Sequence, residues 1–351
     1  MPLSFTYDLT LSWEENYQRG PRFSEPPLPI ANAPLKKFLG FQVCTRIGIA
    51  AGILPNRLWV LPYAQRGFGI LTYKTVRSTA RLSYPLPNWV FVENTPDGPV
   101  TRLEAPPEKP DQISSAVCFG MPSPPPEIWR EDVRQTTRDL PQGHILIVSV
   151  VGTPGPDPSL EALADDFATC AAWAKEAGAH VIEANLSCPN VCSAEGTLYQ
   201  DSTRSRAVAH RIRQAIGSTP LLLKVGTWDR VGAMREFLQA VSGFADGVTL
   251  VNCMNRPVIN SQGHPVFGKD YPTAGVIGRT IHSPCVQAVQ EARNCIDSDG
   301  LGLTLAAVGG VSTVTDIARF FDSGADAVLC GSSPVYLPSL ATDARNLRAD
   351  W

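Results

Sequence analysis

Eight short apolar runs, separated by stretches with helical spacing, constrain this chain more than any other feature of its sequence. They are nearly continuous in apolar, often β-branched residues, and do not alternate between apolar and polar positions. Such runs are typical of strands buried on both faces of a parallel sheet. They occupy residues 47–51, 70–76, 145–151, 180–186, 221–225, 247–252, 305–308 and 327–330.

Amphipathic stretches lie between the runs, and two of them carry clear helix signals. Leu160, Leu163 and Phe167 recur at helical spacing after Ser159, a residue type that caps helix N-termini. The stretch 313–321 is followed by Gly324, as is common after a helix end. Eight strands alternating with helices predict an α/β fold, a (β/α)8 TIM barrel. A doubly wound open sheet is the alternative, and both folds place a site where strands end.

Two stretches interrupt the alternation. Residues 77–144 are too long for a simple connection and include a proline-rich patch, and residues 253–275 form a shorter interruption. We expect an inserted subdomain over the active-site mouth, with the shorter stretch either a lid or a passive surface loop. The expected domains are an N-terminal extension, 1–45, and the barrel with its insertions, 46–351.

The composition excludes several classes of protein. A net charge of −3 gives no reason to expect nucleic acid as a partner. The nine cysteines have no paired spacing, and the histidines show no metal-ligand spacing, so neither a disulfide framework nor a metal is expected. No secretory signal and no apolar stretch of the ~20 residues that span a bilayer is evident. We expect a cytoplasmic protein without stable membrane insertion and with a small-molecule substrate. A homodimer is the candidate assembly, and the oligomeric state stays open.

Polar residues end several of the apolar runs. Two lysines, Lys74 and Lys224, terminate strands, and Asn252-Cys253 follows another. Lysine is almost never fully buried unless it is paired, so these two indicate an anionic ligand. A surface lysine and a capping asparagine are the structural alternatives for Lys224 and Asn252.

Two glycine-containing pairs follow the last two strands, Gly309-Gly310 after the first and Gly331-Ser332 after the second. Glycine lets backbone N–H groups approach phosphate oxygens, and many barrels bind phosphate after strands seven and eight. Either pair alone would be read as a turn. Their joint position predicts a phosphate site.

The ordered motifs resemble those of the dihydroorotate dehydrogenases from about Gly48 to Tyr336. The most specific is Asn185-Leu186-Ser187-Cys188-Pro189-Asn190. The others are Gly48-Ile49-Ala50-Ala51-Gly52, Lys74-Thr75, Pro85-Leu86-Pro87, Lys224, Asn252, Gly275, Gly278, Gly309-Gly310 and Gly331-Ser332. The resemblance implies FMN as cofactor and a dihydropyrimidine, dihydroorotate above all, as substrate.

Roles follow from the resemblance. Oxidising such a ring removes a hydride from one carbon and a proton from its neighbour, and Cys188 stands where the family has its Cys or Ser base; an inert buried thiol is the alternative. Cys188 and Lys224 are the expected catalytic residues. The expected FMN-binding residues are Ala50, Ala51, Gly52, Lys74, Thr75, Lys224, Gly278, Gly309, Gly310, Gly331 and Ser332. The expected substrate-binding residues are Lys74, Asn185, Asn190, Asn252 and Cys253.

The chain departs from the family in two places. The substrate loop, Asn-x-x-Gly-x-Pro-Asn in the family, has Val117 and Ser123 in place of its asparagines. After Gly52, residues 53–56 lack the Asp-Lys of the quinone-using class, although Ala-Ala-Gly resembles that class and the cysteine base resembles the soluble class. The electron acceptor therefore stays open.

Three other functions remain as alternatives. One is an oxidoreductase acting on another dihydropyrimidine, which would not need the two lost asparagines. Another is a flavin-binding protein whose catalysis has been lost. A tRNA dihydrouridine synthase, also an FMN barrel, is disfavoured by the negative net charge and by the roughly 20 residues that follow the last strand.

Overall fold

The structure is a computed structural model that describes residues 3–30, 33–153, 155, 157, 159–187 and 194–351. Within this part of the chain, parallel strands close into one barrel, which confirms the predicted (β/α)8 fold. Around the barrel the strands follow their order in the chain. They are β3 (Ile47–Ile49), β4 (Ile70–Val76), β8 (Ile145–Val150), β9 (Val181–Asn185), β10 (Leu221–Lys224), β11 (Gly247–Leu250), β14 (Thr304–Val308) and β15 (Ala327–Cys330).

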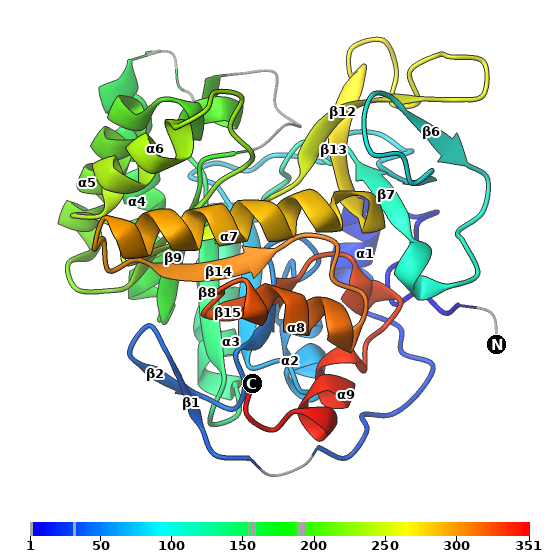
Figure 1. The fold of residues 1–351 in the computed structure, drawn as a ribbon, viewed down its shortest axis with the longest axis horizontal. Helices are drawn as coiled ribbons and strands as arrows, with labels where there is room; N and C mark the ends of the chain where they lie inside the picture. Colours follow the sequence, from blue (N-terminus) through cyan, green and yellow to red (C-terminus); the bar gives the residue numbers. More distant parts are fainter. Residues whose placement is uncertain (1–2, 31–32, 154, 156, 158, 188–193) are drawn as a thin grey trace.

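A helix follows each barrel strand and packs around the outside (Figure 1). The helices are α2 (Arg57–Ala64), α3 (Pro126–Asp139), α4 (Leu160–Glu176), α5 (Ser202–Ile216), α6 (Ala233–Val241), α7 (His282–Ser298), α8 (Val314–Asp322) and α9 (Leu340–Leu347). The Ser159 hydroxyl caps α4 by accepting from the Ala162 N–H, as its sequence predicts. Short 3-10 helices span Pro110–Gln112, Ala194–Gln200, Arg279–Ile281 and Ser333–Val335.

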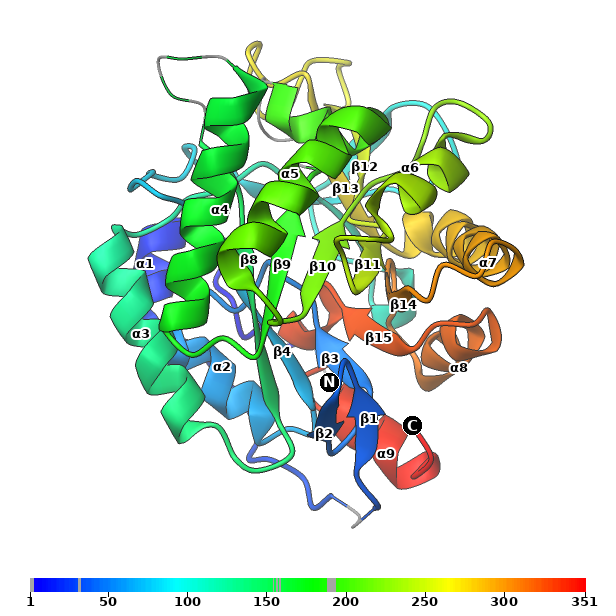
Figure 2. The ribbon, with the colours of Figure 1, turned by 90° about the vertical axis from the view of Figure 1, so that its left-hand side faces the viewer.

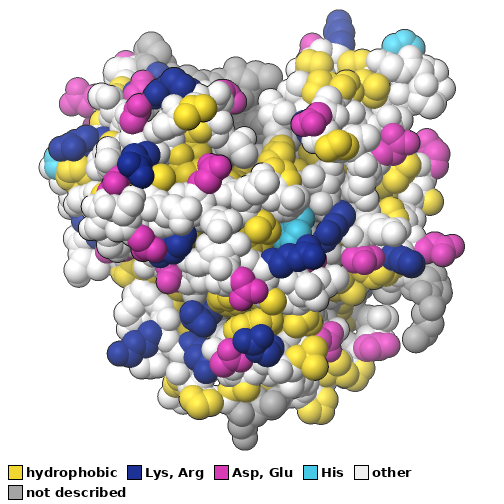
Figure 3. All heavy atoms as spheres, viewed as in Figure 1, with side chains coloured by type: hydrophobic (Ala, Val, Ile, Leu, Met, Phe, Trp, Pro, Cys, Tyr) yellow, Lys and Arg dark blue, Asp and Glu magenta, His cyan; other side chains and the backbone are white. Residues whose placement is uncertain are grey.

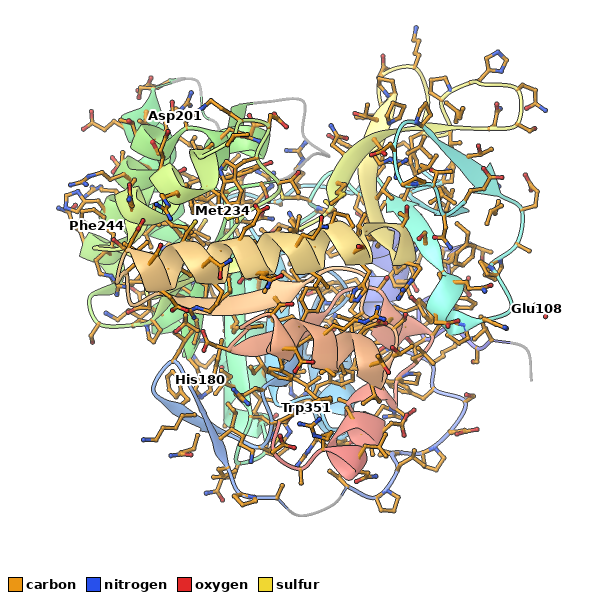
Figure 4. All side chains as sticks on the ribbon, in the orientation of Figure 1. Glu108, His180, Asp201, Met234, Phe244 and Trp351 are labelled. Carbon is orange, nitrogen blue, oxygen red and sulfur yellow. The ribbon has the colours of Figure 1, made fainter. Side chains whose placement is uncertain are left out.

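A hairpin covers the amino-terminal end of the barrel, formed by β1 (Lys36–Phe38) and β2 (Phe41–Val43). Its turn residues, Leu39 and Gly40, both have positive φ, as a type I′ turn requires. Phe38 and Val43 pack on inward-facing side chains of the barrel strands. His180, labelled in Figure 4, lies edge-on to Phe41, with ring centroids 5.3 Å apart. This end of the barrel is therefore filled by apolar packing.

The two interruptions form one small sheet at the opposite end of the barrel (Figure 2). The first contributes β5 (Trp89–Val92), β6 (Val100–Leu103) and β7 (Ser114–Val117), and the second contributes β12 (Met254–Ile259) and β13 (Thr273–Gly278). β13 pairs with β7, and β12 pairs with β6, so the sheet closes on itself. The Arg256 guanidinium joins the two interruptions by donating to the Thr95 and Gly98 carbonyls. Helix α3, although inside 77–144, packs on β4 and β8 as part of the barrel.

A further helix, α1 (Trp13–Arg19), fastens the N-terminal segment beside this sheet. Ser12 and Glu15 form a capping box at its start. The Glu14 carboxylate accepts hydrogen bonds from the N–H and the hydroxyl of Ser83, both at 2.7 Å. The N-terminal segment is thus tied to the connection that leads into the inserted sheet.

On the face shown in Figure 3, basic and acidic side chains are interspersed. In the part of the chain that the structure describes, no helix has the length and apolar character to cross a membrane.

Candidate active site

Two adjoining cavities open at the carboxyl ends of the barrel strands, under the inserted sheet. The larger, which we call the large pocket, is lined by Tyr7, Trp13, Ala50, Ala51, Gly52, Ile53, Lys74, Thr75, Trp89, Val117, Phe119, Met121, Asn185, Lys224, Asn252, Cys253, Ile277, Val308, Gly331 and Ser332. The smaller, the glycine cavity, is lined by Asn252, Ile277, Gly278, Ile281, Val308, Gly309, Gly310, Val311, Gly331 and Ser332. The cavities share Asn252, Ile277, Val308, Gly331 and Ser332.

The structure brings the predicted site residues together. Each of them that it describes lines one cavity or both, although they come from seven of the barrel's strand ends and from β13. Cys188 and Asn190 lie outside the described residues. Among the described residues there is no cluster of three or more His, Cys, Asp or Glu side chains that could hold a metal ion.

Two buried lysines face the large pocket. Lys224 is 2% exposed, and its Nζ donates to the Ala51 carbonyl at 3.3 Å. Lys74 is 8% exposed, and its Nζ lies 6.0 Å and 5.8 Å from the ring centroids of Trp13 and Phe119. The Lys224 ammonium carries three donors, and the one carbonyl that it contacts among the described residues does not balance its charge. The pocket therefore suits a ligand with anionic or carbonyl oxygens.

The amide of Asn185 is held in one orientation. Its Oδ1 accepts the Ser187 N–H at 3.2 Å, which leaves Nδ2 as the group turned to the site. Among the described residues, Nδ2 has only long contacts, to Thr75 Oγ1 at 3.5 Å and to Met121 Sδ at 3.8 Å. Ser149 hydrogen-bonds Thr75 from behind at 3.0 Å. Asn185 can thus donate a short hydrogen bond to a ligand.

The amide of Asn252 is held through its nitrogen, whereas that of Asn185 is held through its oxygen. The Asn252 Nδ2 donates to the carbonyl oxygen of Ser187 and, at 3.1 Å, to the Ser187 hydroxyl. These two bonds assign the amide nitrogen to Ser187 and leave Oδ1 as the acceptor. Asn185 and Asn252 together therefore offer one donor and one acceptor to whatever occupies the large pocket.

The glycine cavity is shaped by backbone conformations and close approaches that favour glycine. Gly278, Gly309 and Gly310 have φ values of 93°, 142° and 66°. A Cβ on Gly310 would lie 2.4 Å from the Gly278 oxygen, and one on Gly309 would lie 2.3 Å from Cys285 Sγ. Gly331 differs, because nothing lies within 4 Å of its ideal Cβ position. The first three glycines close-pack the backbone, whereas Gly331 leaves free space at the cavity.

A buried pair of side chains, His282 and Asp316, supports this backbone from behind. His282 Nδ1 lies 3.0 Å from the Gly309 oxygen, and its Nε2 lies 3.2 Å from Asp316 Oδ1. The Asp316 carboxylate also accepts the N–H groups of Ser312 and Thr313 at the start of α8. Burial lowers the pKa of His282. Burial alone would raise the pKa of Asp316, but His282 and the Ser312 N–H outweigh it, and the net pKa is lowered.

Sequence analysis missed the aromatic part of the large pocket. Tyr7 and Trp13 come from the N-terminal segment, and Trp89 and Phe119 come from the first interruption. Burial raises the pKa of Tyr7 well above its usual range, so the phenol stays neutral. In the sequence these residues look like ordinary core aromatics, because only long-range packing brings them to the site.

The two departures from the family's substrate loop lie in different surroundings. Val117 ends β7 and lines the large pocket. Ser123 is 3% exposed, lines neither cavity, and its hydroxyl accepts the Arg77 N–H at 3.1 Å. Of the two positions, only Val117 can change what the pocket recognises.

Known proteins similar to this chain agree with the predicted family. The family model for dihydroorotate dehydrogenase matches residues 35–342. A dihydroorotate dehydrogenase of Dictyostelium discoideum is 30% identical over 360 residues, which cover 97% of this chain and 96% of that protein. A putative dihydroorotate dehydrogenase A (fumarate) of Aeropyrum pernix is 27% identical over 318 residues, which cover 89% of this chain and 87% of that protein.

Solved structures support the fold in the same way. Two crystal structures of a DHODH from Eimeria tenella, one with ferulenol and one ligand-free, match at TM-score 0.71 and 17% identity. They cover 91% and 95% of this chain, and 85% and 91% of the solved chains. With the family match and the Dictyostelium relative, the conclusion is that this chain belongs to the dihydroorotate dehydrogenase family, whose members are FMN-dependent oxidoreductases acting on CH–CH groups.

Proposed function

We propose that this protein oxidises dihydroorotate to orotate with bound FMN. The observation that carries the proposal is the pair Asn185 and Asn252, which line the same pocket, are both oriented by Ser187, and offer one donor and one acceptor. A pyrimidine ring has a complementary edge, in which a carbonyl oxygen adjoins a ring N–H. A site that pairs both groups discriminates strongly against ligands that lack either of them.

The residues present fit FMN. The glycine cavity offers backbone N–H groups and the free space beside Gly331 to a phosphate group. Lys224 is a buried cation in the adjoining pocket, as a flavin ring with an electron-rich edge requires. FMN, when bound, supplies the acceptor for a hydride. We propose that the predicted set from Ala50 to Ser332 holds it.

The chain's own residues orient the substrate and accept the proton that it loses. Asn185 donates to a ring carbonyl and Asn252 accepts a ring N–H, which fixes the ring in its plane. Lys74 offers its ammonium to the substrate's carboxylate. Cys188 takes the proton from the ring carbon next to the one that loses the hydride. A thiol of ordinary pKa ~8.5 does this once it is deprotonated or has a path to pass the proton on.

Anaerobic mixing tests the proposal. The purified protein should be yellow, and excess dihydroorotate should bleach the flavin within seconds. Flavin that binds but stays oxidised would contradict dihydroorotate as the substrate, and a colourless protein that cannot be reconstituted would contradict FMN.

Two cysteine variants then test whether Cys188 is the base that takes the proton. Cys188→Ser should slow bleaching at least tenfold while FMN stays bound, because a hydroxyl is a much weaker acid than a thiol. Cys295→Ser, on the partly exposed outer helix α7, is the matched control and should bleach at the wild-type rate. Equal rates in both variants would move the base elsewhere.

One observation favours a second candidate substrate. Val117 places an apolar side chain in the large pocket where the family has an asparagine, so a different dihydropyrimidine is the next candidate. The homodimer and the cytoplasmic location stay predictions, and light scattering with cell fractionation would test them.

A further inference from the structure

One side of the large pocket is a continuous apolar wall. Val117 of β7 lies directly opposite Trp89 of β5 in the inserted sheet, so the two side chains leave the same face. Ile277 of β13 pairs with Ser115, two residues before Val117, and is therefore on that face as well. Phe119 and Met121 continue the lining after β7. We call Trp89, Val117, Phe119, Met121 and Ile277 the apolar wall.

Met121 is held in the wall at a cost in backbone energy. Its φ of +52° is in the left-handed region, which an unbranched side chain adopts at roughly 1 kcal/mol. The fully buried Arg77 fixes this conformation, because its Nε donates to the Met121 carbonyl at 3.2 Å. Met121 is itself 6% exposed and touches the Asn185 amide through its sulfur. Strain of this kind persists where the surroundings enforce it, often at functional sites.

The wall faces a pocket whose other side is polar. Lys74, Asn185, Lys224 and Asn252 supply charge and hydrogen bonds from the barrel strands. Within the wall the Trp89 indole is the one group with a conventional donor, and its Nε1 is buried. Val117 itself offers a ring edge turned toward it no hydrogen-bonding side chain. A polar group there would lose water without replacement, whereas a methyl group would gain contacts.

We propose that this site accepts, and binds preferentially, dihydropyrimidines that carry a small apolar substituent on the ring edge facing Val117. The proposal rests on the function proposed above and specifies the substrate class of the same site. Val117 is the specificity-determining residue. An asparagine at this position would instead require a ring group that hydrogen-bonds.

The chemistry of the ring is unchanged by such a substituent. One ring C–H bond breaks and its electron pair leaves as hydride to the bound flavin. The neighbouring C–H loses its proton to the base, and a C=C double bond forms between the two carbons. A methyl group on either nitrogen, or on the carbon that keeps one hydrogen, takes no part in this balance.

Binding of oxidised products to the holoenzyme tests the proposal without turnover. Orotate, 5-methylorotate, 1-methylorotate and 3-methylorotate are titrated separately, and the dissociation constants are read from the change in flavin absorbance. One added methyl group in a fitting apolar pocket improves binding by about tenfold or more. We therefore expect at least one methylated ligand to bind more tightly than orotate.

Variants at one position assign the preference to Val117. Val117→Asn should reverse the ratio of the two dissociation constants, because it should strengthen the binding of orotate and weaken the binding of the favoured methylated ligand. Val117→Thr keeps the shape and adds a hydroxyl, so it should move the ratio in the same direction by less. Val117→Ala removes volume without adding polarity, and it should weaken the methylated ligand while leaving orotate unimproved. FMN content, measured after gel filtration, should stay the same in all three variants.

The outcomes are decisive in both directions. Weaker binding of all three methylated ligands than of orotate, or a ratio that Val117→Asn leaves unchanged, would overturn the proposal while the proposed function stands. Failure of the proposed function looks different: FMN is bound, but neither orotate nor any methylated orotate perturbs its spectrum, and both proposals fall.

Discussion

The glycine cavity and the large pocket meet at Gly331 and Ser332 but are built in different ways. The glycine cavity is made of backbone, in turns that follow consecutive strands of the barrel. The large pocket is made of side chains, which arrive from α1, the inserted sheet and the barrel strands. A backbone site depends on conformations that few residues can adopt. A site of side chains can exchange one of them, as at Val117, and keep its walls.

The difference separates two properties of the enzyme. With FMN in the glycine cavity, as proposed, cofactor binding is linked to the fold itself, because the glycine backbone close-packs on His282 and Cys285. Substrate choice is linked to residues whose replacement leaves the barrel intact. We therefore expect substitutions of the close-packed glycines, Gly309 and Gly310, to affect folding and FMN together. Substitutions of Val117 or Asn185 in the large pocket should affect the substrate and leave FMN bound.

The largest effect should follow from Gly310→Ala. Its φ of +66° and the 2.4 Å approach of a Cβ to the Gly278 oxygen combine backbone strain with a clash. Together these cost about 3 kcal/mol, so FMN retention should fall more than 100-fold and the flavin-free protein should unfold earlier in urea. Gly331→Ala is the matched control, because it has open space and should weaken FMN without lowering apo stability. Equal urea curves for the two variants would break the comparison.

Lys224→Met should have the next largest effect. The variant keeps the length of the side chain and removes the buried ammonium and its bond to the Ala51 carbonyl. Hydrogen bonds to charged groups contribute about 1.5–3 kcal/mol, so the rate of flavin reduction by dihydroorotate should drop by about 10- to 100-fold. Lys175→Met, on the exposed side of α4, should reduce at the wild-type rate. Stopped-flow absorbance measures the rate of flavin reduction in both variants. A wild-type rate in Lys224→Met would show that this lysine does not assist flavin reduction.

Asn185→Asp sharpens the contrast within the large pocket. An aspartate keeps the acceptor for the Ser187 N–H but presents an oxygen where the amide presents its donor. Orotate should bind about 30-fold more weakly, with FMN content unchanged. Asn252→Asp instead loses both bonds to Ser187 and should also destabilise the protein. Tight orotate binding by Asn185→Asp would show that the donor is not used.

The smallest effect should be the contribution of Asp316 to the pH dependence of the free energy of unfolding. Its pKa is lowered in the folded protein, so the unfolded chain takes up the proton first as the pH falls. The stabilisation is present above the ordinary aspartate pKa of 3.8 and is lost as the pH drops through the lower pKa of the folded protein. Asp316→Asn should cost about 1 kcal/mol at pH 7, and the difference from wild type should shrink below pH 4. Urea unfolding of the flavin-free proteins at both pH values measures it, and a constant difference would contradict the assignment.

Most of the barrel could be predicted because its signals are local. Each apolar run became a barrel strand, with ends displaced by at most a few residues, and Ser159 and Thr313 cap the helices that follow them. The two interruptions were recognised as breaks in the pattern. Their union into one closed sheet was not predicted, because β6 and β12 pair across more than 150 residues and no periodicity records such a register.

The sequence by itself determined the barrel, the strand-end lysines and asparagines, and the glycines of the proposed phosphate site. Strand burial and backbone sterics are properties of a few consecutive residues, so their patterns can be read along the chain. Only the tertiary structure decided that Tyr7, Trp13, Trp89, Phe119 and Met121 surround the same pocket as Lys74 and Asn185. Aromatic and apolar side chains fit a core as well as a binding site, and the contacts that choose between them join distant segments.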